Sequence, residues 1–203
     1  MIYKGALFIN KFNKHKILKN KMVKTDLKIQ NIVATTSLGV DVPLQKLVRS
    51  QANTEYNPEQ FPGLVLRIKK PKSAVLVFSS GNLVCTGTKS TTQVNEVIAQ
   101  VIKQLRKIGV KAKERPKITV QNIVASGSID LKMDLNRLSL ELENTEYEPE
   151  QFPGLVYKLE SPNATFLLFS NGKLVCTGTK NRDQLNEAMK QLIKNTKNLS
   201  SKK

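Results

Sequence analysis

The sequence contains little of what disulfide scaffolds, metal sites and most enzymes are built from. Its 203 residues include two cysteines, no tryptophan and one histidine, His15. There is no CxxC motif or cysteine–histidine cluster, so no disulfide framework and no metal site are expected. Its one histidine lies outside any motif, so a catalytic triad that contains histidine is not expected. No Walker or Rossmann glycine pattern occurs either. No apolar run reaches about 18 residues, which excludes a spanning helix. We therefore expect a non-enzyme with no cofactor and no membrane segment.

Acidic residues are also scarce. Thirty-three Lys and Arg face 16 Asp and Glu, which gives a net charge of +17. An excess of this size indicates a polyanionic partner, usually nucleic acid, although a soluble protein of a high-salt or hot cell is an alternative. Residues 1–24 hold seven lysines, no acid and no secretory signal pattern. We interpret them as a flexible basic arm, unless translation starts at Met22.

An internal repeat with an offset of 91 residues organises the rest of the chain. Three motifs occur twice: QNIVA at 30 and 121, TEYxPEQFPGLV at 54 and 145, and SxGxLVCTGTK at 79 and 170. Two long copies are too few for a solenoid, which needs short periods and at least about three units. Residues 25–115 and 116–203 are therefore predicted to be two similar halves of a pseudo-twofold molecule.

Each half is predicted to consist of strands followed by one long helix. In the first half, alternation and apolar runs predict strands at 28–35, 64–68, 74–78 and 83–86, with a short helix at 42–51 whose first turn contains Pro43. Ser90 begins a capping box, and apolar residues spaced by three or four predict a helix that ends at Gly109. This pattern is typical of an α+β layer fold with a mostly antiparallel sheet.

Both faces of this sheet are predicted to be apolar. In the strand at 74–78, Val75 and Val77 point to one side, whereas Leu76 and Phe78 point to the other. One helix per half covers only one face, and a large exposed apolar face marks an interaction surface. The charge requires an anionic partner, and the minor groove of DNA offers sugar and base edges between two rims of phosphate. By the same parity, Cys85 and Cys176 are expected to be buried free thiols under the helices.

The doubled motifs resemble those of the TATA-box-binding proteins, of archaeal type, over residues 27–195. The resemblance implies one curved, saddle-like antiparallel sheet made of two pseudo-twofold repeats, with helices on its convex face. It also implies a general transcription factor that binds the minor groove of A/T-rich TATA promoter elements. Such a factor kinks the DNA and recruits transcription factor B and RNA polymerase. It is intracellular and associated with DNA, in the cytoplasm or nucleoid.

The resemblance also assigns roles to individual residues on the uncovered face. Paired phenylalanine wedges, which unstack base steps, match Phe61, Phe78, Phe152 and Phe169. Asn31 and Asn122 match asparagines that donate to the acceptors shared by A·T and T·A pairs, with Thr86 and Thr177 beside them. The apolar floor between these groups matches the following residues: Val33, Leu76, Val84, Val124, Leu167 and Val175.

Charged residues complete the set that the resemblance implies. Cations at phosphate-contact positions are Arg67, Lys89, Lys158, Lys173 and Lys180, and Gln30 and Gln121 are further candidates. Five contacts predict a log–log salt dependence of affinity with a slope of about −4 to −5. Asn82 stands where the second half has Lys173, so the first half lacks one cation. Glu148 and Glu150, in an acidic loop, are expected to contact the basic transcription factor B, although a merely solubilising loop is an alternative.

Two other functions are compatible with the residues alone. One is a substrate-gripping domain of a nuclease or glycosylase with a similar fold. The other is a protein-only scaffold whose apolar sheet binds another protein. The same apolar face also allows self-association when no DNA is bound.

Overall fold

A computed structural model describes residues 26–197, so the predicted basic arm at 1–24 lies outside the described residues. The two repeats contain the same elements in the same order. The first repeat consists of β1 (Lys28–Ser37), α1 (Leu44–Ser50), β2 (Thr54–Glu55), β3 (Leu64–Ile68), β4 (Ser73–Val77), β5 (Asn82–Thr88) and α2 (Thr91–Lys107). The second consists of β6 (Thr119–Ser128), α3 (Leu135–Glu141), β7 (Thr145–Glu146), β8 (Leu155–Leu159), β9 (Ala164–Leu168), β10 (Lys173–Thr179) and α4 (Arg182–Thr196).

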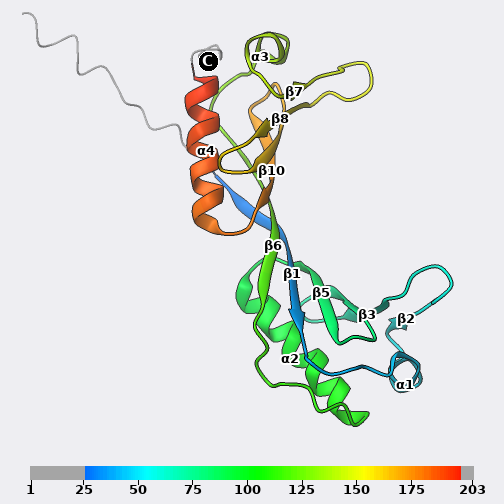
Figure 1. The fold of residues 1–203 in the computed structure, drawn as a ribbon. Helices are drawn as coiled ribbons and strands as arrows, with labels where there is room; N and C mark the ends of the chain where they lie inside the picture. The colour runs from blue at the N-terminus through cyan, green and yellow to red at the C-terminus, as the bar shows by residue number, and fades with distance from the viewer. Residues whose placement is uncertain (1–25, 198–203) are drawn as a thin grey trace, which may run out of the picture.

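These strands form one antiparallel sheet in the order β2-β3-β4-β5-β1-β6-β10-β9-β8-β7. The repeats join at β1 and β6, where Ile32 pairs with Ile123, its own counterpart 91 residues later. The pseudo-twofold axis therefore passes through the middle of the sheet. The residue just before β1, Leu27, packs against the core of the second repeat. The expected fold, one curved antiparallel sheet built from two repeats, is confirmed (Figure 1).

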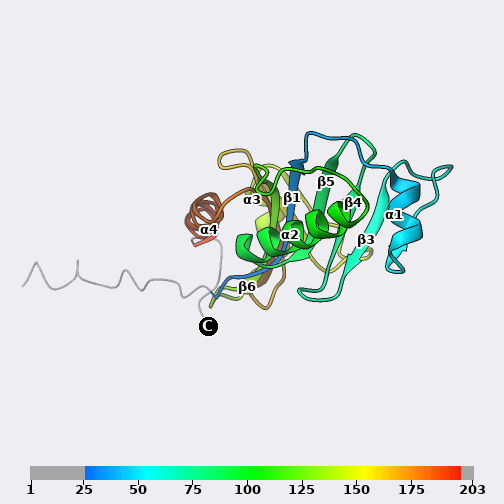
Figure 2. The same ribbon diagram turned by 90° about the horizontal axis from the view of Figure 1, so that it is seen from below.

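The long helices α2 and α4 cover one face of the sheet (Figures 1 and 2). Each helix presents an apolar stripe that includes Val97 and Val101 in α2, and Leu185 and Leu192 in α4, all buried. Burying each such side chain contributes about 1.5–3 kcal/mol. Each repeat therefore has its own core between its helix and its half of the sheet.

Both long helices begin with a capping interaction, as the sequence predicts for α2. The Gln93 N–H donates to Ser90 Oγ at 3.2 Å, and the Gln184 N–H donates to Asn181 Oδ1 at 2.8 Å. The return bonds differ from the usual capping box. The Gln93 side chain accepts from the N–H of Lys89, one residue before the cap. The glutamine thus fixes the backbone of a predicted phosphate contact.

Three element boundaries differ from those predicted. Pro43 is the N-cap of α1 and does not lie in its first turn. Phe78 lies just beyond β4, because its N–H donates to the Asn82 oxygen within the hairpin turn. β5 continues beyond Thr86 through Gly87, whose φ of +92° is in the left-handed region. An added Cβ there would lie 3.0 Å from the Ser73 backbone, so glycine suits the position.

The two cysteines are buried and unpaired, as predicted. Burial raises the pKa of Cys85 to about 11 and that of Cys176 to about 12. Both thiols are therefore protonated and unreactive at neutral pH. Among residues 26–197, no helix is long and apolar enough to cross a bilayer, and no cluster of three potential metal ligands occurs.

Candidate nucleic-acid interface

The sheet face opposite α2 and α4 remains accessible, and we call it the open face. Strand alternation puts Ile32 and Val75 into the cores, where they are buried, and their neighbours Val33 and Leu76 onto the open face, where they are half-buried. All six predicted floor residues are half-buried in this way: Val33, Leu76, Val84, Val124, Leu167 and Val175. Partly exposed apolar side chains that gather on one face make that face a candidate binding surface.

Two pairs of phenylalanine rings lie at equivalent places in the two repeats. Phe61 and Phe78 have ring centroids 5.9 Å apart in an edge-to-face arrangement, and Phe152 and Phe169 are 6.0 Å apart in the same geometry. Phe61 and Phe152 are 43% and 44% exposed, unusual values for such large apolar residues. The four predicted wedges therefore form two aromatic pairs, each with one exposed and one half-buried ring, and none of the four belongs to the buried cores.

A glycine makes each ring pair possible. An added Cβ on Gly63 would lie 2.6 Å from Cε1 of Phe61, and one on Gly154 would lie 2.5 Å from Cε1 of Phe152. Because real Cβ contacts are longer than this, any other residue would push the ring away. A backbone turn also fixes each ring, since the N–H groups of Phe61 and Phe152 donate to the carbonyls of Asn57 and Glu148.

The two asparagine side chains have a defined orientation on the open face. Asn31 Oδ1 accepts from the Gly87 N–H at 2.7 Å, and Asn122 Oδ1 accepts from the Gly178 N–H at 2.8 Å. A backbone N–H requires an oxygen acceptor, so the amide nitrogen must take the other position. There Nδ2 lies 3.1 Å from Thr86 Oγ1, and 3.0 Å from Thr177 Oγ1 in the second repeat. Each repeat therefore presents an amide donor beside a hydroxyl.

The predicted phosphate contacts fall into two groups. Lys89, Lys173 and Lys180 are exposed and make no ion pair with any other described residue. Arg67 and Lys158 are also exposed, but each is paired with a carboxylate, Glu55 and Glu146 respectively. No carboxylate of the described residues neutralises the first three cations, although Lys89 Nζ donates to Gln30 Oε1 at 3.5 Å, whereas Arg67 and Lys158 each hold a carboxylate.

The remaining predicted residues lie at the centre of the sheet and in the acidic loop. Gln30 Nε2 donates to Ser126 Oγ at 2.8 Å and Gln121 Nε2 donates to Thr35 Oγ1 at 2.7 Å, so both glutamines bridge the repeats. Glu148 and Glu150 are exposed in the β7–β8 loop. This loop and the β2–β3 loop project from the two ends of the sheet, away from α2 and α4 (Figure 1).

Several residues of the interface were not identified from the sequence. They are the orienting amides of Gly87 and Gly178, the ring-supporting Gly63 and Gly154, and the carboxylates Glu55 and Glu146. All of them recur at the 91-residue offset. The recurrence of these residues was the available signal, but their contacts depend on the three-dimensional fold.

Known proteins match both the sequence and the fold. The family model described as "Transcription factor TFIID (or TATA-binding protein, TBP)" matches residues 26–108 and 117–199. A TATA-box-binding protein of Archaeoglobus fulgidus is 45% identical over 175 residues, 85% of this chain and 96% of that protein. One from Natronomonas pharaonis is 47% identical over 172 residues, 84% and 92% of the two chains. The solved structure of Methanococcus jannaschii TBP superposes with a TM-score of 0.82 at 42% identity and covers 85% of this chain and 99% of its own.

Proposed function

Because the chain belongs to the TATA-binding protein family, we propose that its open face binds the minor groove of A/T-rich promoter DNA and bends the duplex. Members of this family are general transcription factors that bind TATA DNA with the transcription machinery, and they are not enzymes. The alternative of an enzyme's substrate-gripping domain is therefore wrong.

The observation that carries the proposal is the pair of oriented amides in the middle of an apolar face. Adenine N3 and thymine O2 are the acceptors of the minor-groove floor in both A·T and T·A pairs. Asn31 and Asn122 present Nδ2 donors to them, since Gly87 and Gly178 hold the oxygens. The exocyclic amine of guanine, itself a donor, would face the Nδ2 donor there and find no hydrogen-bond acceptor. The two symmetric contacts thus favour A/T content without reading strand order.

The exposed ring pairs supply the bend in this proposal. An apolar side chain inserted at a base step unstacks it at a cost of a few kcal/mol and opens the minor groove. Phe61 and Phe152 are the more exposed rings, and Phe78 and Phe169 contact them from the β4–β5 and β9–β10 hairpins. The widened groove then covers the half-exposed valines and leucines of the open face, which offsets the cost.

The A/T preference is tested by titrating the protein against matched duplexes in a mobility-shift assay. An A/T-rich duplex should bind several kcal/mol more tightly than one with G/C substitutions at the centre, since each mismatched position costs about 1–3 kcal/mol. Equal affinities would overturn the proposed reading of sequence. A protein-only scaffold predicts no binding to either duplex beyond what charge alone provides.

We also propose that the acidic β7–β8 loop binds the basic transcription factor B and so brings RNA polymerase to one side of the bent DNA, inside the cell. The loop carries Glu148 and Glu150 where the first repeat has Asn57 and Glu59. This difference breaks the pseudo-twofold symmetry in charge. A symmetric DNA platform would thereby acquire a direction of transcription.

Replacing Glu148 and Glu150 by glutamine is expected to weaken the ternary complex with transcription factor B. The loss should be roughly 0.5–2 kcal/mol, because exposed ion pairs contribute about 0.2–1 kcal/mol each. A supershift titration on preformed protein–DNA complex measures it, with the exposed α2 residue Glu96→Gln as control. An unchanged ternary complex would leave the loop with only a solubilising role.

A further inference from the structure

Two of the predicted phosphate-binding cations already hold an anion of their own chain. We propose that Glu55 and Glu146 are internal substitutes for DNA phosphate, which Arg67 and Lys158 must release before they bind the DNA backbone. The carboxylates would lower the affinity for DNA of any sequence. The contacts in the minor groove would then determine which sequence the protein prefers. This inference rests on the proposed binding of DNA to the open face.

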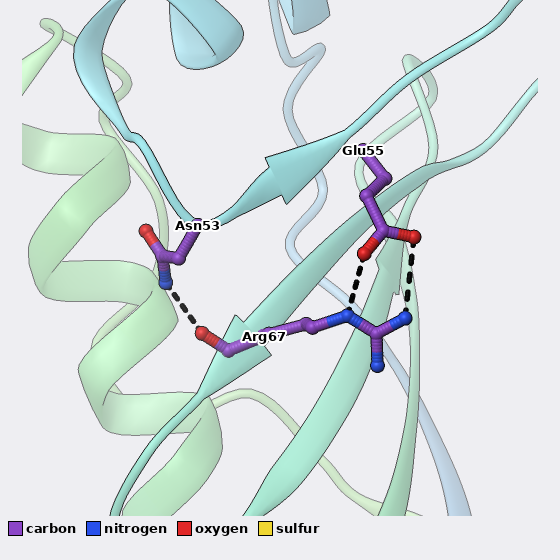
Figure 3. A network of polar contacts seen from close by, with 3 residues as sticks. All are labelled: Asn53, Glu55 and Arg67. Atoms are coloured by element: carbon purple, nitrogen blue, oxygen red, sulfur yellow. Dashed lines mark hydrogen bonds and ion pairs between the residues drawn. The ribbon is translucent and has the colours of Figure 1, made fainter.

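The Glu55–Arg67 pair has the geometry that an arginine uses with phosphate. Arg67 Nε donates to Glu55 Oε1 at 2.7 Å and Nη2 donates to Oε2 at 3.2 Å, two parallel bonds (Figure 3). Carboxylate and phosphate bind the guanidinium through this same two-bond arrangement. A phosphate therefore competes directly with Glu55 for these two donors.

The carboxylate lies on the open face and not on the helix side. Glu55 pairs with Val65 across β2 and β3. Directly opposed residues of an antiparallel pair point to the same face. Val65 and Arg67 are two residues apart in β3, so they also share a face, while Leu64, Leu66 and Ile68 between and around them are buried in the core. Glu55 thus places a negative charge on a surface proposed to bind a polyanion.

The backbone around this pair is fixed, which keeps the carboxylate in reach of the arginine. The Arg67 N–H donates to the Asn53 carbonyl at 2.9 Å, and Asn53 Nδ2 donates to the Arg67 carbonyl (Figure 3). Asn53 thereby ties the two strands together beside the pair. The hydrogen bond and the charge of the Arg67 guanidinium also lower the pKa of Glu55, which favours the ionised carboxylate.

The second repeat has the same arrangement although its cation is a lysine. Lys158 Nζ lies 2.5 Å from Glu146 Oε1, Glu146 pairs with Val156, and the Lys158 N–H donates to the Asn144 carbonyl. The side chains of the two pairs are 54–68% exposed. Exposed ion pairs contribute little to folding. Their place on the DNA-facing surface is better explained by an effect on binding.

The proposal is tested with Glu55→Gln, which keeps the shape and removes the charge. Affinity is measured at several salt concentrations on an A/T-rich and a G/C-rich duplex. The variant is expected to bind both duplexes about two- to fivefold more tightly, in line with the strength of an exposed pair. Its log–log salt slope should become steeper by up to about 0.9, the value for one more neutralised phosphate. Glu55→Gln with Glu146→Gln should roughly double the change in slope.

Two comparisons separate anion exchange from a general effect of charge. Glu59→Gln makes the same change of charge in the β2–β3 loop, where the carboxylate forms no ion pair with any described residue, and it should keep the wild-type slope. In an Arg67→Gln background, Glu55→Gln should lose most of its gain, since no cation remains to be released.

Weaker binding by Glu55→Gln would overturn the proposal, because the carboxylate would then only position Arg67. An unchanged slope, or an equal gain from Glu59→Gln, would overturn it as well. Failure of the proposed function has a different signature. In that case the wild-type protein itself fails to prefer the A/T-rich duplex, whatever the variants do.

Discussion

Replacing Phe61 and Phe152 together by alanine is expected to abolish most of the bend in an A/T-rich duplex. Bending a short site costs about 1–6 kcal/mol, and in the proposed function the inserted rings make the bent form accessible. Without them the groove stays narrow, and the apolar floor between the ring pairs loses its contact with DNA. We expect affinity to fall at least about 100-fold, which corresponds to about 2.7 kcal/mol.

The bend is measured by energy transfer between dyes at the two ends of the duplex. The folded protein should tolerate the change, because both rings are more than two-fifths exposed and their edge-to-face contact contributes only about 0.5–1.5 kcal/mol each. Leu140→Ala is a matched control, since this α3 side chain is apolar and 86% exposed outside the ring clusters. A double variant that bends DNA like wild type would refute the wedge role.

The sequence predicted on which face of the sheet the candidate residues lie, because strand alternation and helix periodicity are local signals. Alternation along a strand depends only on backbone geometry, so the faces of Asn31, Val33 and Leu76 followed from spacing alone. The capping box at Ser90 and the apolar stripe of α2 are equally local signals. The resemblance to TATA-box-binding proteins added the roles of the phenylalanines, which parity alone left open.

The features that were not predicted depend on long-range register. The pairing of β1 with β6, and the register shifts on either side of Ile32, arise where the two repeats meet. The ion pair between Glu55 and Arg67 requires β2, a strand of two residues that has no periodicity to detect. The steric role of Gly63 also appears only when two rings from different segments fold over it.

Changing Asn31 and Asn122 to aspartate is expected to remove the preference for A/T-rich DNA. Aspartate retains an oxygen that accepts from the Gly87 or Gly178 N–H, so the local fold is kept. The other oxygen replaces an amide donor and faces the adenine N3 and thymine O2 acceptors, so two acceptors oppose each other. The loss should reach at least about 1–3 kcal/mol per position, the scale of a specific base contact.

Alanine at the same positions separates the two parts of this effect. Asn31→Ala with Asn122→Ala removes the donors without adding charge. Binding to the A/T-rich duplex should therefore weaken less than with aspartate. The difference in affinity between the A/T-rich and G/C-rich duplexes should shrink to a similar extent. Asn136→Asp controls for the addition of one negative charge, because this exposed residue lies on α3 and not on a strand of the open face. Competition titrations on the two duplexes measure the ratio directly. A ratio unchanged by alanine would mean that the apolar floor and the deformability of A/T steps, and not the amides, select the DNA.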